Sequence, residues 1–343
     1  MPDDRREPPR RRARLVDVAA AADTSPPIAS RILSRDPTLS VGVALRERVL
    51  AAANELQYRP SAAARGVRLG ATGAIGMITP PLTNPVLLRI VRGAHRRAMA
   101  RGVVVLIVED TDEQQAYDAF TDLIHAGRID GLLVMAARPE HPILPVLARQ
   151  DVPHVFVNRA VADTGRNVIL EEATACAIAI DHLIDLGHKH IGHLASPANL
   201  DPTVRRTRAV MERARVRGIP PIAIEHGETM ERGGAEAGAR LLARHPEITA
   251  LFATSPGQAA GAMFAAWEMG LAIPRDLSVI AYIDTPLADV LIPPLTTVSM
   301  PVEELGAAGV DALLDQLAGA PPEDRVIPTR AELLIRASTG PPR

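Results

Sequence analysis

The sequence predicts an N-terminal all-α helix-turn-helix module followed by a two-lobed α/β body with doubly wound parallel sheets. Three observations lead to this fold class. The chain has 343 residues, enough for two or three folded units with substantial cores. Short helical patterns fill the first part of the chain, and apolar runs alternate with helical patterns from Thr72 onward. The charge is also divided, because residues 1–70 carry a net +5 while the whole chain carries −2. A basic terminal module on an acidic body indicates that the small end meets a polyanion.

Composition excludes several classes of protein. Hydrophobic residues make up 47% and charged residues 23%, which is typical of globular chains rather than disordered or fibrous ones. Cys176 is the sole cysteine, so neither an intrachain disulfide nor a cysteine-built zinc site is possible. No window approaches eighteen continuous apolar residues, and no apolar run follows the arginine-rich start. We therefore expect a cytoplasmic protein with no membrane partner.

The N-terminal elements follow from helical spacing. Residues 1–13 are rich in proline and arginine and are expected to form a disordered basic tail, and residues 14–59 are expected to form the helix-turn-helix domain. The first helix starts near Leu15, breaks at residues 23–25 and gives way to a second helix. A third begins after Ser40, a plausible N-cap, and places apolar residues on one face, namely Leu45, Val49, Ala53 and Leu56.

The second helix has the pattern of a DNA-recognition helix. Its apolar face consists of Ala29, Ile32 and Leu33, which leaves Ser30 and Arg31 free to face a major groove. A structural helical hairpin is the alternative interpretation of the same pattern.

The body, expected over residues 72–343, alternates strands and helices. Largely apolar runs typical of buried parallel strands occur at 74–78, 103–108, 131–135 and 154–157, and again at 191–195, 250–253 and 278–282. Open parallel sheets bind ligands at the carboxyl ends of their strands, so two facing lobes predict a small-molecule cleft between them.

Enzyme chemistry finds little support. Gly70, Gly73 and Gly76 lack the dinucleotide-binding spacing, and no phosphate-binding loop is present. The histidines between 182 and 193 suggest packed or surface residues rather than ligands, because His190 and His193 fall on opposite faces of a strand. No Ser/His/acid arrangement has a recognisable nucleophile turn. We expect no catalytic residue, metal or cofactor.

Eight segments in order along the chain resemble the lactose/galactose repressor (LacI/GalR) family of bacterial transcription regulators. They are DVA at 17–19, SRIL at 30–33, RERVL at 46–50, YRPSAAAR at 58–65, NP at 84–85, DGLL at 130–133, LGH at 186–188 and PPLTTV at 293–298. The resemblance runs from about Leu15 to Thr339. It implies an operator-binding headpiece, a hinge helix or linker at 60–71, a body resembling periplasmic sugar-binding proteins, and a homodimer.

The resemblance also implies DNA-binding positions. They are Ser25, Pro26, Pro27, Ser30, Arg31, Ser34, Ser40, Tyr58, Ser61, Ala64 and Val67. Pro26 and Pro27 depart from the family, whose members usually place hydrogen-bonding side chains there, so contact at these positions can only be apolar. Val67 stands where the family typically has a leucine that wedges into the minor groove, and Gly66 weakens the hinge helix further. A plain alanine-rich linker is the alternative interpretation of the hinge.

Effector-binding positions are implied in the same way. They are Val86, Asn158, Arg159, Arg206, Thr229, Ser255 and Ile283. Arg206 falls on the arginine that commonly grips ligand oxygens. Val86, Leu87 and Thr229 replace frequent aromatics, and Ile283 replaces an aspartate that ties down hydroxyls. The family favours a sugar or sugar derivative, whereas the residues themselves also suit a smaller or anionic molecule held by Arg206, and a cleft that binds nothing remains an alternative.

These features predict a ligand-responsive, DNA-binding transcription regulator. We expect it to act as a repressor that binds a palindromic, inverted-repeat operator in double-stranded DNA as a homodimer, with a small-molecule effector, a carbohydrate or small anion, in the cleft. The alternative is a cytosolic small-molecule-binding protein that does not regulate DNA.

Overall fold

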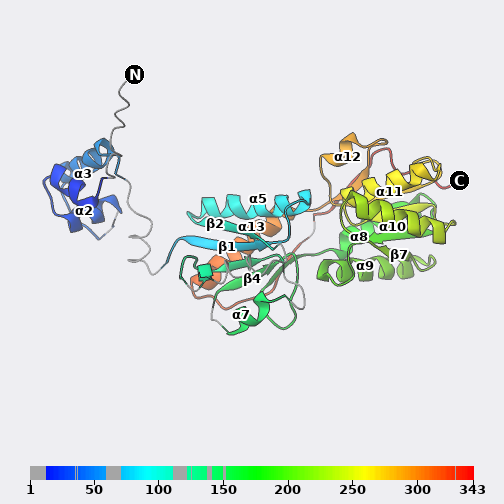
Figure 1. Cartoon of the computed structure of the whole chain (residues 1–343), viewed down its shortest axis with the longest axis horizontal. Coiled ribbons are helices and arrows are strands. Elements are labelled where there is room, and N and C mark those ends of the chain that lie inside the picture. The colour runs from blue at the N-terminus through cyan, green and yellow to red at the C-terminus, as the bar shows by residue number, and fades with distance from the viewer. Residues whose placement is uncertain are drawn as a thin grey trace, which may run out of the picture. The chain divides into compact units, whose positions relative to one another are not determined.

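The computed structural model divides the chain into two compact units, residues 1–72 and 73–343 (Figure 1). It describes residues 13–34, 36, 38–58, 71–110, 122–124, 126–136, 141–149, 152–328 and 330–343. None of the helices in these ranges is long and apolar enough to span a membrane.

In the described part of the first unit, the headpiece, three helices form a bundle. They are α1 (Leu15–Ala21), α2 (Pro26–Leu33) and α3 (Val43–Glu55). Their buried faces meet in one small core, to which each helix contributes, for example Val18, Ile32 and Val49. The predicted apolar face of the second helix is confirmed for Ala29 and Ile32, which are buried, while Leu33 is half-buried against the same core.

The third helix begins later than the sequence predicted. Its N-cap is Gly42 rather than Ser40, and residues 39–42 are not helical. The reason is packing, because Leu39 and Val41 both contact the headpiece core along this non-helical stretch.

The second unit contains two six-stranded sheets, as the alternating pattern predicted. The N-terminal lobe has the order β11-β5-β4-β3-β1-β2, with strands β1 (Ala74–Thr79), β2 (Val104–Glu109), β3 (Leu132–Val134), β4 (His154–Val157), β5 (Asn167–Leu170) and β11 (Arg325–Ile327). The C-terminal lobe has the order β12-β10-β9-β8-β6-β7, with strands β6 (Ile191–Ala195), β7 (Ala223–His226), β8 (Ala250–Ala253), β9 (Ser278–Tyr282), β10 (Thr296–Ser299) and β12 (Glu332–Leu334). Every pairing is parallel except that of β10 with β12.

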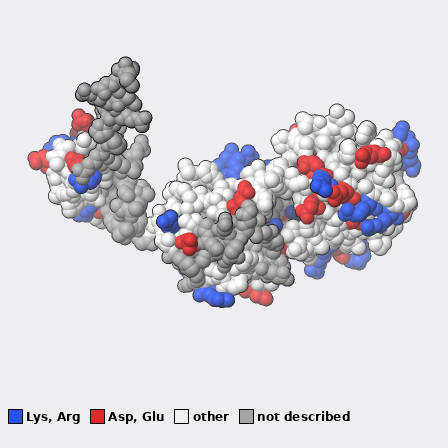
Figure 2. All heavy atoms as spheres, viewed as in Figure 1, with Lys and Arg blue, Asp and Glu red and all other residues white. Residues whose placement is uncertain are grey.

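Helices cover both sheets. Among the described residues, the helices of the N-terminal lobe are α5 (Pro85–Ala100), α7 (Ile143–Arg149) and α13 (Val302–Leu317). Those of the C-terminal lobe are α8 (Ala173–Asp185), α9 (Asp201–Arg217), α10 (Glu231–Arg244), α11 (Pro256–Glu268) and α12 (Leu287–Val290). Ion pairs join α5 to α13, where Arg92 and Arg96 both contact Glu303. Figure 2 shows a basic patch along the upper edge of the N-terminal lobe, with separate acidic and basic groups elsewhere on it, and acidic and basic groups interleaved on the C-terminal lobe.

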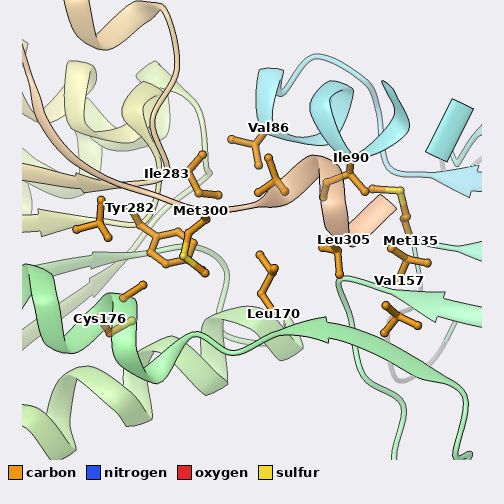
Figure 3. Packing of buried hydrophobic residues seen from close by; sticks show 14 of the residues in the cluster. Val86, Ile90, Met135, Val157, Leu170, Cys176, Tyr282, Ile283, Met300 and Leu305 are labelled. Carbon is orange, nitrogen blue, oxygen red and sulfur yellow. The ribbon is translucent and has the colours of Figure 1, made fainter. Parts of the chain in front are cut away.

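The chain passes between the lobes several times, and its crossings share one apolar core. After β5 it enters α8, and after β10 it returns through Met300 to α13. One cluster of buried side chains therefore runs from Tyr282 in the C-terminal lobe to Leu305 and Val157 in the N-terminal lobe (Figure 3). The lobes are joined by packed side chains as well as by the backbone.

Candidate functional site

The start of α2 is the most distinctive part of the headpiece. Ser25 is the N-cap and is exposed, and Pro26 and Pro27 form the first turn. The Ser25 side chain makes no capping hydrogen bond. A capping serine normally accepts from the N–H of the second or third helical residue, and Pro27 has no N–H to offer. Pro27 is exposed, so the first turn of α2 presents an apolar surface.

Arg31 lies on the outer side of α2, but it is not free as the sequence suggested. Its side chain is 42% exposed and donates from Nε to Asp36 Oδ2 at 2.8 Å and from Nη2 to Thr38 Oγ1 at 3.0 Å. The hydrogen bonds from Arg31 and Thr38 lower the pKa of Asp36 to about 2. The turn after α2 brings Asp36 back against the helix, which the spacing of residues alone does not reveal.

The other predicted DNA-binding residues occupy different environments. Ser34 and Ser40 are exposed, and the Ser34 hydroxyl donates to the Arg31 carbonyl. Ser30, which the sequence suggested would be free, is half-buried, and Tyr58 is half-buried against the headpiece core. Ser61, Ala64, Gly66 and Val67 lie outside the described residues.

The second candidate site is a cavity of ≈ 310 Å³ between the lobes of the body. It is lined by all seven predicted effector residues, namely Val86, Asn158, Arg159, Arg206, Thr229, Ser255 and Ile283. The N-terminal lobe contributes the β1–α5 loop, the start of α5 and the end of β4, and the C-terminal lobe contributes the loops after β6, β7, β8 and β9. The rule that open parallel sheets bind ligands at the carboxyl ends of their strands, here called the strand-end rule, thus predicted the position of the cavity.

Two lining residues adopt a left-handed backbone. Asn158 follows β4 with φ +71°, and Ile283 follows β9 with φ +70°. This conformation is unusual for a β-branched residue and costs on the order of 1–3 kcal/mol. A hydrogen bond from the Ile283 N–H to the Val298 carbonyl, 2.8 Å long, holds it in place. Ile283 is almost fully buried, so this wall of the cavity is apolar.

Arg206 lines the cavity, but two of the three guanidinium nitrogens already donate to a carboxylate of the protein. Glu172, at the start of α8, accepts from Nε at 3.0 Å and from Nη2 at 3.2 Å. The guanidinium carbon also lies 4.3 Å from the ring centre of Tyr282, a cation–π contact. Burial alone would lower the pKa of Arg206, but the charge of Glu172 raises it overall. The guanidinium is therefore charged, and the carboxylate of Glu172 neutralises that charge.

A second arginine holds the two lobes together beside the cavity. Arg205 of α9 donates to the Asn158 carbonyl at 3.0 Å and pairs with Asp201 at 3.0 Å. Asp201 in turn accepts the N–H of Ala160 at 2.9 Å. On the other side Arg89 of α5 donates to the Asp284 carbonyl at 2.6 Å. Polar contacts between the lobes thus flank the cavity.

Several lining residues were not predicted. Ser196 and Thr254 follow β6 and β8, so the strand-end rule could have found them. Glu172, which lies behind Arg206 rather than on the cavity wall, gave no signal, since its importance arises only from contact with Arg206, 34 residues away. Three of the four histidines considered for a metal site have protein partners: His182 contacts Thr339, His188 contacts Thr249, and His193 contacts the Phe252 carbonyl. The fourth, His190, is exposed.

Comparison with known proteins identifies relatives of both units of the chain. The pattern described as "Bacterial regulatory proteins, lacI family" matches residues 14–61, and "Periplasmic binding protein-like domain" matches residues 180–339. The ribose operon repressor of Escherichia coli K12 is 31% identical over 310 residues, covering 89% of this chain and 93% of the relative. The transcriptional repressor CytR of the same organism is 32% identical over 330 residues, covering 95% and 96%. A crystal structure of the lac repressor dimer bound to operator and the anti-inducer ONPF superposes with a TM-score of 0.83 at 28% identity, covering 96% of this chain and all of that one.

A helix-turn-helix headpiece joined to a two-lobed body with an interlobe cavity defines a ligand-responsive, DNA-binding transcription regulator. The chain belongs to the lacI family of bacterial regulatory proteins.

Proposed function

We propose that this regulator is a cytoplasmic repressor without catalytic activity, and that it binds an inverted-repeat operator as a homodimer. The observation that carries the proposal is the presence in one chain of an exposed recognition-helix start and a cavity lined by residues of two lobes. One short recognition helix contacts few base pairs, so specificity requires two half-sites related by the symmetry of a dimer. The lac repressor structure is described as such a dimer on its operator.

The headpiece contacts are proposed residue by residue. Ser25, Ser34 and Ser40 are exposed and suit phosphate or base contacts. Pro27 suits apolar contact with a thymine methyl group, since its side chain neither donates nor accepts. The operator should therefore differ in sequence from those of relatives that carry polar residues at these positions.

The effector is proposed to be a sugar or sugar derivative. The relatives include the ribose operon repressor of Escherichia coli K12. The cavity, at ≈ 310 Å³, lies at the small end of the range for small-molecule sites. A compound of monosaccharide size fits that volume better than a large ligand does.

A gel-shift assay tests the repressor proposal against that of a binding protein with no role on DNA. Full-length protein should retard DNA from upstream of its own gene, and an effector sugar should change the affinity. The Ser34→Asp variant, with a negative charge on the exposed end of α2, should lose retardation while the body keeps its thermal stability. Sugar binding without retardation of any upstream DNA would favour the alternative.

A further inference from the structure

The C-terminal-lobe wall of the cavity contains a chain of hydrogen-bonded side chains. Thr229 Oγ1 lies 3.2 Å from Ser196 Oγ, and Ser196 Oγ lies 3.0 Å from Thr254 Oγ1. Thr254 Oγ1 lies 2.8 Å from Gln258 Oε1. The three hydroxyl residues line the cavity, and Gln258 is fully buried behind them.

The direction of this chain is fixed at its buried end. The Gln258 Nε2 group lies 3.2 Å from the Ala195 carbonyl and 3.4 Å from the Glu228 carbonyl, and both of these can only accept. The Gln258 Oε1 atom must therefore face Thr254, whose hydroxyl and backbone N–H both donate to it. This arrangement uses the only hydroxyl proton of Thr254.

Each further hydroxyl follows from the one before it. Ser196 must donate to Thr254, because Thr254 has no proton left, and Thr229 must then donate to Ser196. The hydroxyl proton of Thr229 is thus used in the bond to Ser196, and only the lone pairs of Thr229 Oγ1 remain for a ligand in the cavity. Thr229 is therefore a hydrogen-bond acceptor among the residues that line the cavity.

The charges around the cavity balance. Arg159, Arg206 and Glu228 line it, and Glu172 pairs with Arg206 from behind. Arg159 also donates to the Ala136 carbonyl at 3.0 Å. Among the described residues, Nη1 of Arg206 has no hydrogen-bond partner, so the arginine offers one remaining donor group rather than an uncompensated positive charge.

We propose that Thr229 is a specificity-determining acceptor and that the cavity selects an uncharged ligand that donates an O–H or N–H to it. The inference rests on the proposed effector site and names the chemical class of its ligand. A carboxylate at this wall has no proton to donate, so its oxygens would repel the Thr229 oxygen and leave that acceptor without a partner. The small-anion interpretation suggested by Arg206 alone is thereby disfavoured.

Matched pairs of ligands test the proposal. Calorimetric titration of the full chain compares D-glucose with D-glucuronate, D-galactose with D-galacturonate, and D-mannose with D-mannuronate. Each pair shares the pyranose ring and differs at C6, where a carboxylate replaces the hydroxymethyl group. The best uncharged sugar should bind at least roughly ten-fold more tightly than its acid, the equivalent of one hydrogen bond and one unpaired acceptor.

Two variants identify the groups responsible. Thr229→Val keeps the shape of the side chain but removes the acceptor, and should weaken the best sugar by roughly ten-fold. Thr174→Val makes the same change on the exposed start of α8 and should leave the affinity unaltered. Glu172→Gln leaves Arg206 uncompensated and should shift the preference towards the acid of each pair. If Glu172→Gln does not fold, Thr229→Val still decides.

The outcomes separate this inference from the function on which it rests. An acid that binds as tightly as its sugar, or a Thr229→Val variant with unchanged affinity, overturns the role of Thr229. If such an acid also releases the operator, the regulator remains ligand-responsive and only its ligand class is wrong. If no compound binds although the protein retards DNA, both the effector site and the inference fail.

Discussion

At the scale of single residues, the pairing of Arg31 with Asp36 modulates the charge of the recognition helix. An acidic group on a surface that approaches phosphates opposes binding, and it also occupies the guanidinium that would contact DNA. Arg31→Ala should therefore weaken operator binding by roughly ten-fold, and Asp36→Asn should strengthen it several-fold. Fluorescence anisotropy with a labelled operator at fixed salt measures both. If both variants bind the operator with the affinity of the wild type, Arg31 does not contact DNA.

His193 makes the stability of the body depend on pH. It is fully buried on β6, its Nδ1–H donates to the Phe252 carbonyl at 3.0 Å, and its Nε2 has no partner in the described structure. Burial lowers its pKa from 6.5 to about 4, with the Phe252 carbonyl opposing the shift. Because the unfolded chain takes up the proton more readily, the stabilisation is complete above pH 6.5 and is lost as the pH falls towards 4.

The expected loss from this one residue is about 3 kcal/mol, since each pKa unit corresponds to about 1.4 kcal/mol. Urea unfolding of the body between pH 7 and pH 4 measures it. His193→Asn, whose amide can still donate to Phe252, should reduce the change in unfolding free energy between pH 7 and pH 4 by that amount. His190→Asn, at an exposed position just before β6, is the control. An unchanged pH dependence in His193→Asn would show that this histidine is not the buried base.

At the scale of elements, each lobe contains a helix pair in close contact through glycines. A Cβ atom on Gly93 of α5 would lie 2.0 Å from the backbone oxygen of Glu303, and one on Gly306 of α13 would lie 2.0 Å from that of Ile90. Gly234 of α10 and Gly261 of α11 meet backbone equally closely in the other lobe. These helices can approach only without a side chain at the crossing.

Gly93→Ala should therefore destabilise the body by about 3 kcal/mol, because backbone atoms must move apart. Gly340→Ala serves as a control, since its Cβ would meet Pro274 at 3.5 Å, an ordinary contact. Scanning calorimetry measures both. If Gly93→Ala has the same melting temperature as the wild type, the contact between α5 and α13 is looser than described.

The elements differ in how far the sequence predicted them. Buried parallel strands are continuous apolar runs, so the seven predicted strands lie within a residue or two of their observed bounds. The start of α3 was misplaced because Ser40 is a good cap by type, whereas the packing of Leu39 and Val41 decided the conformation. All seven implied effector residues line the cavity, but the Glu172 pair and the direction of the hydroxyl chain depend on contacts between distant segments, which spacing does not encode.

At the scale of the whole molecule, the C-terminal lobe exposes an apolar surface suited to a second copy of the chain. On α11, Phe264 is 52% and Trp267 71% exposed, and their rings lie 5.9 Å apart. Val290 and Ile292, on and after the adjoining α12, are exposed as well. Exposed aromatic residues of this kind are typical of protein interfaces.

Trp267→Asp should accordingly shift the protein from dimer to monomer, because it places a charge within the proposed interface. Sedimentation velocity gives the state of association, and Arg232→Asp on the exposed face of α10 is a control for added negative charge. A Trp267→Asp variant that remains dimeric at low micromolar concentration would place the interface elsewhere.

The central claim is that two headpieces read one inverted repeat and that a ligand in the cavity governs this binding. Footprinting of the full-length protein on DNA upstream of its gene, with and without the best-binding sugar, tests it most directly. The account predicts a protected site with two-fold symmetric half-sites, and protection that changes when the sugar is added. The Thr229→Val variant should need a higher sugar concentration to show the same change. Equal protection of an isolated half-site, or protection that no cavity-binding sugar alters, would contradict it.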